Sequence, residues 1–113
     1  MGDKRSRLRL PAKEYALLRL QVFDRDKRRC RICGVRNPLH AHHIVFRSNG
    51  GPDTSGNLIT LCNNCHDAVH FRGKPGQGVV ILPLKEGAPI DADKGFKLLY
   101  VNGWKPKTNI KKR

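Results

Sequence analysis

The chain has 113 residues, which allows one small domain, and its lysines and arginines outnumber its acidic residues by 23 to 9. The formal net charge of +14 exceeds what solubility needs and favours a polyanionic partner, nucleic acid before an acidic membrane surface. No segment approaches the ~20 apolar residues of a membrane-spanning helix. The N-terminus has no apolar signal core, so we expect a reducing cytoplasmic location, where four cysteines favour a metal site over disulfides.

A helix is predicted near the start of the chain, after a basic arm at residues 1–10. Proline suits the first turn of a helix, and residues 11–27 begin with one. Tyr15, Leu18 and Val22 then recur at helical spacing. We interpret this stripe as a face buried in the core.

The middle of the chain alternates between short elements. Residues 39–46 are predicted to form a strand, on which the adjacent His42 and His43 point to opposite faces. A loop rich in turn-forming residues follows, then a short apolar segment and a helix over about residues 64–71. Beyond a glycine-rich linker, two weaker apolar runs, 79–82 and 96–101, indicate two more strands.

Two Cys-x-x-Cys pairs bracket this middle segment: Cys30 and Cys33 before it, Cys62 and Cys65 at its end. Each pair can turn both sulfurs onto one ion, and four thiolates bind Zn²⁺ tetrahedrally. We therefore expect a structural zinc site that joins the two ends of the segment. Free cysteines or two disulfides are the alternative.

The histidines predict a second metal site. His66 and His70 lie four residues apart on the expected helix and share a face, which suits a pair of metal ligands. One histidine of the tandem can complete that site, and the other is then free to act as a base beside the ion.

The order of these residues resembles the HNH (ββα-metal) endonuclease family. The resemblance rests on His-His-Ile (42–44), Arg-Ser-x-Gly-Gly (47–51) and Asn-Leu-x-x-Leu-Cys-x-x-Cys-His (57–66), and covers roughly residues 30–70. With the patterns above, it implies a small α+β fold, in which the four-cysteine zinc site stabilises a ββα-metal core. We expect four segments: a basic arm (1–10), the nuclease core with its preceding helix (11–72), a C-terminal β-hairpin extension (73–104) and a basic tail (105–113).

Carried over by position, the resemblance implies catalytic roles for several residues. His43 is similar to the general base that takes a proton from the attacking water. His42 and His66 resemble ligands of the catalytic divalent ion, with His70 as the third ligand, and Asn57 resembles the residue that braces the loop around the base. The ion would be Mg²⁺, Mn²⁺, Ni²⁺ or Zn²⁺.

Several neighbouring residues stay open between a site role and a structural one. His40 faces the same way as His42 and could be an extra ligand, although lone strand histidines are usually structural. We interpret Asp53 as a loop residue and Asp67 as a helix-surface charge. Arg47 could contact the scissile phosphate or be solvated. The expected DNA-binding residues are Arg28, Arg29, Arg31 and Arg47.

The function predicted from these features is metal-dependent hydrolysis of DNA phosphodiester bonds, as nicks or double-strand cuts, with low intrinsic sequence specificity. A non-catalytic zinc module that binds nucleic acid is the alternative, but it leaves the histidines and Asn57 without a purpose. A nuclease acting mainly on RNA is a further option. The basic tails resemble those of free-standing phage or mobile-element HNH proteins, so a partner such as phage packaging machinery, and a monomer or homodimer, are expected.

Overall fold

The computed structural model of the protein describes residues 9–106. The predicted basic arm and basic tail therefore lie outside the described part, apart from residues 9–10 and 105–106. The elements are α2 (Ala12–Arg25), β1 (Leu39–His43), η1 (Arg47–Asn49), η2 (Ser55–Asn57), β2 (Leu58–Cys62), α3 (Asn63–Val69), β3 (Gly78–Leu82) and β4 (Lys97–Val101). This small α+β arrangement confirms the predicted fold class. Among the described residues, no helix has the length and apolar character needed to cross a membrane.

Helix α2 begins directly after Pro11, whose carbonyl accepts the N–H of Tyr15 at 2.8 Å. It ends at Arg25, two residues before the predicted end, because Lys27 and Arg28 turn into the left-handed region at φ 59° and 53°. The predicted stripe only partly faces the core: Val22 is buried, while Tyr15 and Leu18 are half-buried.

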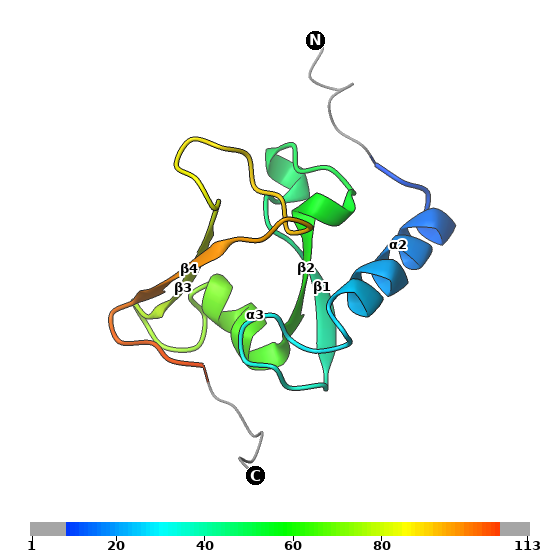
Figure 1. The fold of residues 1–113 in the computed structure, drawn as a ribbon. Coiled ribbons are helices and arrows are strands. Elements are labelled where there is room, and N and C mark those ends of the chain that lie inside the picture. Colours follow the sequence, from blue (N-terminus) through cyan, green and yellow to red (C-terminus); the bar gives the residue numbers. More distant parts are fainter. Residues whose placement is uncertain (1–8, 107–113) are drawn as a thin grey trace.

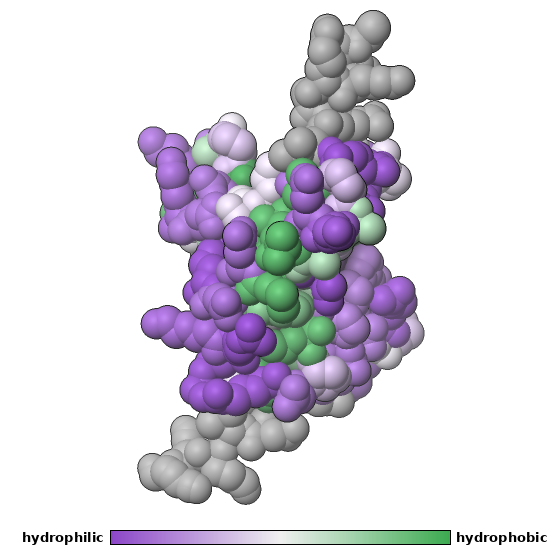
Figure 2. Space-filling model, turned by 90° about the vertical axis from the view of Figure 1, so that its right-hand side faces the viewer, coloured by the Kyte–Doolittle hydropathy of each residue, from purple (hydrophilic) through white to green (hydrophobic). Residues whose placement is uncertain are grey.

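The outer face of α2 carries exposed apolar residues. Leu17 is 59% exposed and Leu20 is 47% exposed. Figure 2 views the molecule from the side on which α2 lies and shows a band of hydrophobic surface with hydrophilic residues on both sides. The helix therefore presents apolar groups both to the core and to solvent.

The core forms around β2, all five residues of which are buried. β1 and β2 pair antiparallel, with His42 opposite Ile59 and His43 opposite Leu58. β1 ends at His43 instead of at the predicted residue 46. The N–H of Ile44 still bonds to the carbonyl of Asn57 at 2.8 Å in register with the strands, but the N–H of Val45 bonds to the side-chain oxygen of Asn57 at 2.8 Å instead of to backbone. The chain then enters the loop that holds the two short 3₁₀ turns η1 and η2.

The C-terminal part of the described chain forms a second antiparallel pair, β3 and β4. Helix α3 lies between the two pairs of strands (Figure 1) and contacts both. Ile81, Phe96 and Trp104 from this part pack against the core cluster that contains the cysteines. The extension is thus packed onto the same core as β1, β2 and α3.

The buried carboxylate of Asp26 joins α2 to this core. It accepts hydrogen bonds from Nε and Nη2 of Arg25 at 2.8 and 2.9 Å, from Arg31 at 2.6 Å and from the backbone N–H of Thr60 in β2 at 3.1 Å. Burial alone would raise the pKa of Asp26, but the hydrogen bonds from Arg25 and Thr60 and the charge of Arg31 lower it. The carboxylate is therefore ionised and fully partnered.

We predict that Asp26→Asn lowers the free energy of unfolding by about 3 kcal/mol, because it removes the buried carboxylate of the ion pairs and leaves Arg31 without its acidic partner, while Arg25 keeps Asp93. Chemical denaturation followed by circular dichroism measures this loss. Asp24→Asn is the matched control, since Asp24 pairs with Arg28 on the exposed side of the helix, and its cost should stay within about 0.5 kcal/mol. Equal effects of the two changes would contradict a structural role for the buried pair.

Candidate metal centres and active site

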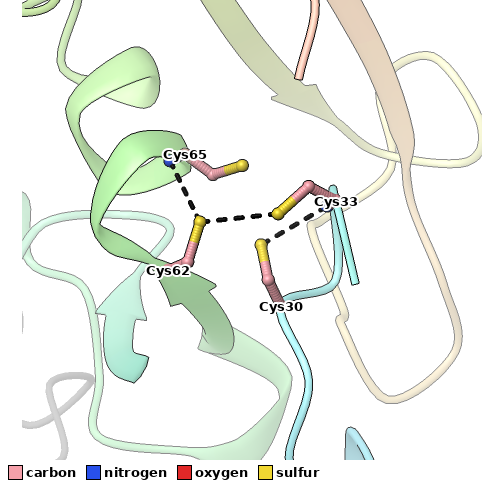
Figure 3. A group of neighbouring side chains, drawn as sticks. All are labelled: Cys30, Cys33, Cys62 and Cys65. Carbon is pink, nitrogen blue, oxygen red and sulfur yellow. Dashed lines mark hydrogen bonds between the residues drawn. The ribbon is translucent and has the colours of Figure 1, made fainter. Parts of the chain in front are cut away.

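The four cysteines meet at one point, although they come from two distant segments. Cys30 and Cys33 lie in the loop after α2, Cys62 ends β2, and Cys65 lies in the first turn of α3 (Figure 3). Their sulfur atoms all lie within 4.8 Å of one another, and those of Cys33 and Cys62 are 3.5 Å apart. Sulfurs bound at about 2.3 Å around a tetrahedral Zn²⁺ would lie about 3.8 Å apart. The spacing therefore fits a zinc ion.

The chemistry of the four sulfurs also fits a cation. The backbone N–H groups of Ile32 and Cys33 point at the sulfur of Cys30, and that of Cys65 points at the sulfur of Cys62, at 3.4 to 3.5 Å. Such donors favour thiolates. Burial raises the pKa of Cys33 to about 11, and a hydrogen bond to Cys30 raises the pKa of Cys65. A divalent cation at the centre would remove this resistance to ionisation.

Three of the histidines form a second cluster. His42 from β1 and His66 and His70 from α3 each bring a ring nitrogen within 4.8 Å of the others. Burial, followed by the neighbouring His66 and His70, lowers the pKa of His42 to about 3, and burial also lowers the pKa of His66 and of His70. The three rings are therefore neutral near pH 7, which is the form that binds metal ions.

His40, the fourth histidine on this side of the sheet, lies outside the ligand group. Its ring is stacked against His66 at 5.1 Å and forms a hydrogen bond with the side chain of Asn63. Its Nε2 atom is thus engaged by the first residue of α3.

His43 points to the other face of β1 and meets a buried carboxylate. Its Nε2 atom lies 2.8 Å from Oδ1 of Asp53, which is 1% exposed. Sequence reasoning treated Asp53 as a loop residue and missed this contact. One signal was available: Asp53 is the only acidic residue between His43 and His66.

Asp53 is held ionised by several donors. Arg47 donates to its two oxygens at 3.0 and 2.8 Å, and the backbone N–H of Leu10 donates at 3.0 Å. Burial would raise the pKa of Asp53, but the hydrogen bonds from Arg47, Leu10 and His43 lower it to about 2. Because a carboxylate only accepts, a neutral His43 carries its proton on Nε2 and leaves the lone pair of Nδ1 free.

Helix α2 supplies the other contacts around His43. The ring of Tyr15 is stacked on the imidazole, with centroids 5.8 Å apart and an interplanar angle of 12°. The guanidinium of Arg47 also lies over the Tyr15 ring, 4.8 Å from its centre. The tandem histidines thus lie in two environments, one suited to metal binding and one to proton transfer.

The side chain of Asn57 spans the loop between β1 and β2. Its oxygen accepts the N–H of Val45 at 2.8 Å, and its nitrogen donates to the carbonyls of Val45 and Pro52, each at 3.0 Å. These bonds hold the chain on both sides of the loop, one residue before Asp53 and two residues after His43.

The four arginines expected at the DNA lie in different settings. Arg28 pairs with Asp24 on the surface, and Arg29 reaches the carbonyl of Gly34 at 3.5 Å. Arg31 and Arg47 are oriented by the buried carboxylates described above. Their contacts with DNA stay predictions.

A single shallow hollow of about 280 Å³ brings His43 and the three clustered histidines together. His42, His43, His66 and His70 all line it, with Ala41, Phe46 and Arg47. A water molecule and a phosphate in this hollow could face the lone pair of the base and the ligand cluster at once. The arrangement suits hydrolysis of a phosphate ester.

Comparison with known proteins agrees with this chemistry. The HNH endonuclease family model matches residues 29–72. Two curated relatives are similar: the type IV methyl-directed restriction enzyme EcoKMcrA of Escherichia coli K12, 31% identical over 64 residues, and anaredoxin of Nostoc, 31% identical over 58 residues. The matches cover 49% and 50% of this chain, 23% of the restriction enzyme and 76% of anaredoxin. No solved structure matches significantly. With the matched region spanning both the cysteine and the histidine clusters, the chain belongs to the HNH endonuclease family.

Proposed function

We propose that the protein is a metal-dependent endonuclease that hydrolyses DNA phosphodiester bonds, with His43 as the general base and one catalytic divalent ion. The observation that carries this proposal is that a base with a fixed tautomer and three neutral histidines line the same hollow. The restriction enzyme among the relatives and the basic charge of the chain support DNA as the substrate.

The base acts through its Nδ1 atom. Asp53 holds the proton on Nε2, so Nδ1 is the nitrogen left to act as an acceptor, and in this proposal it takes a proton from a water molecule in the hollow, placed against the phosphorus. The imidazolium that forms is stabilised by the Asp53 carboxylate, and Arg47 keeps that carboxylate ionised. Tyr15 limits rotation of the ring by stacking on it.

His42, His66 and His70 would hold the catalytic ion. When bound, a divalent ion supplies positive charge that stabilises the charge developing on the phosphate and on the leaving 3′ oxygen. All-histidine ligation favours Ni²⁺ or Zn²⁺ in affinity, while Mg²⁺ and Mn²⁺ are the other candidates. In this scheme Asn57 braces the loop that carries Asp53, and the cysteine cluster holds a structural Zn²⁺.

The proposed segments divide these tasks. Residues 11–72 form the nuclease core with its helix, and residues 73–104 form an extension that covers α3. One active site cuts one strand, so nicking is the minimal activity, and the few side chains around the hollow imply low sequence specificity. A binding-only zinc module would need neither the Asp53–His43 pair nor the histidine cluster, and both therefore favour the nuclease.

We predict that the wild-type protein nicks supercoiled plasmid DNA with a divalent ion and that His43→Ala lowers the rate about 100-fold or more, because the base is lost. Gel assays with Mg²⁺, Mn²⁺ or Ni²⁺ measure this, with EDTA as the blank. His40→Ala is the matched control and should keep most of the activity. Intact DNA binding without cleavage in any ion would instead support the binding module.

Asp53→Asn should also lower the cleavage rate, by about 100-fold or more, because an amide can donate to Nε2 and so place the proton on the wrong nitrogen. Single-turnover plasmid assays measure the effect, and the exposed change Asp24→Asn should stay within about twofold of wild type. A wild-type rate for Asp53→Asn, with the fold intact, would remove Asp53 from the proposed mechanism.

Cys62→Ser should abolish stoichiometric zinc binding and the cooperative thermal transition, since the cluster joins the two segments that carry β2, α3 and the loop after α2. Metal analysis and a circular dichroism melt test this. Wild-type protein stripped by a strong chelator should behave like the variant. A variant that keeps its zinc and melts normally would refute the structural-zinc proposal.

A further inference from the structure

A second, apolar hollow lies beside the histidine cluster. It has a volume of about 150 Å³, which is below the range of drug-sized sites and suits one flat ring system. Two residues, His42 and Phe46, line both this hollow and the active-site hollow. The rest of its lining is apolar: Ile44, Val69, Phe71, Val79, Val80 and Ile81.

Two half-exposed phenylalanines form the rim of this apolar hollow. Phe46 is 40% exposed and Phe71 is 37% exposed. Phe46 is stacked on His70, with centroids 5.3 Å apart, and meets His42 edge-on at 5.9 Å. It therefore forms the wall between the apolar hollow and the three-histidine cluster.

The backbone of Phe71 adopts a conformation that phenylalanine rarely takes. It follows the last turn of α3 at φ 56°, in the left-handed region that favours glycine. Its N–H bonds to the carbonyl of Ala68 at 3.1 Å, and the N–H of Arg72 bonds to that of Asp67 at 2.9 Å, which is the Schellman pattern of a helix end. A bulky side chain at this position is a strained choice of the kind found at functional sites.

The neighbouring strand makes room for this ring. A β-carbon placed on Gly78 of β3 would approach the Phe71 ring to 2.9 Å and the carbonyl oxygen of Ala68 to 2.4 Å. The ring thus rests in the space that Gly78 leaves, with one part still exposed. Both the strained residue and the glycine hold an aromatic surface at the edge of the active site.

We propose that the apolar hollow receives one unpaired nucleobase of the DNA strand, stacked on Phe71, next to the phosphate that is cut. The place of that phosphate rests on the proposed nuclease function. Every base has a flat π-face and stacks on exposed aromatic side chains without sequence readout. A paired base is already stacked within the duplex and must leave it to reach the hollow. The substrate class that fits is single-stranded, bulged or mismatched DNA.

The test is a binding experiment that needs no cleavage. His43→Ala protein is titrated into three labelled DNAs of one sequence: a perfect duplex, a duplex with a single bulged 2-aminopurine, and the single strand. Phe71→Leu, which keeps the apolar bulk without the π-face, should weaken binding to the bulged and single-stranded DNA about tenfold. Duplex binding should change less than twofold.

Two further variants complete the design. Stacking on Phe71 should quench the fluorescence of the bulged 2-aminopurine. Phe71→Trp keeps a stacking face, so it should retain both this quenching and the affinity for unpaired DNA. The emission of the introduced tryptophan should fall on binding. If Phe71→Leu does not fold, these two signals decide the question, and their absence refutes the proposal. Tyr100→Leu is the matched control, because Tyr100 is an exposed aromatic outside the lining of the hollow, and it should bind like the parent.

The outcomes separate this proposal from the proposed function. An equal loss on paired and unpaired DNA, or no loss on either as expected for a site that binds an apolar protein segment, overturns the base pocket. If wild type cleaves plasmid while Phe71→Leu binds bulged DNA normally, the pocket alone is wrong. If wild type never cleaves while Phe71→Leu selectively loses unpaired DNA, the pocket stands and the nuclease fails.

Discussion

The meeting of four sulfur atoms at the junction of β2 and α3 is the constraint on which the position of the histidine cluster depends. Cys62 is both the last residue of β2 and the cap of α3, where its sulfur accepts the N–H of Cys65. The direction in which α3 leaves the sheet is therefore fixed at the cluster. That direction brings His66 and His70 against His42 on β1, so one cluster of ligands positions the other.

Acidic residues are few in this chain, and two of them are buried as partners of arginine. Asp26 orients Arg25 and Arg31 between α2 and β2, and Asp53 orients Arg47 beside the base. Both carboxylates also accept backbone N–H groups, which holds each of them ionised despite burial. Asp26 joins the end of α2 to β2, while Asp53 accepts the N–H of Leu10 just before the helix and Arg47 lies over the ring of Tyr15, so a helix outside the matched family region comes to contact His43.

Local patterns were enough to predict much of this arrangement. Strict alternation along β1 predicts that His42 and His43 lie on opposite faces, and the two Cys-x-x-Cys spacings predict one shared centre, which the cluster of four sulfur atoms matches. Contacts that depend on the path of a loop were not predictable in this way. The partner of His43 lies ten residues away across irregular backbone, and the left-handed turn at Phe71 contradicts the usual preference of its residue type.

One donor to Asp53 has a particular consequence for how the contacts of this carboxylate can be tested by mutation. The backbone N–H of Leu10 completes the set of bonds to the carboxylate, and replacing the leucine side chain leaves that N–H in place. An alanine substitution at residue 10 therefore does not test this bond. Shortening the chain to Pro11 would remove the donor, and a proline at position 10 would do so without shortening it. Only changes to the main chain at residue 10 can reveal whether this bond helps to hold Asp53 against His43.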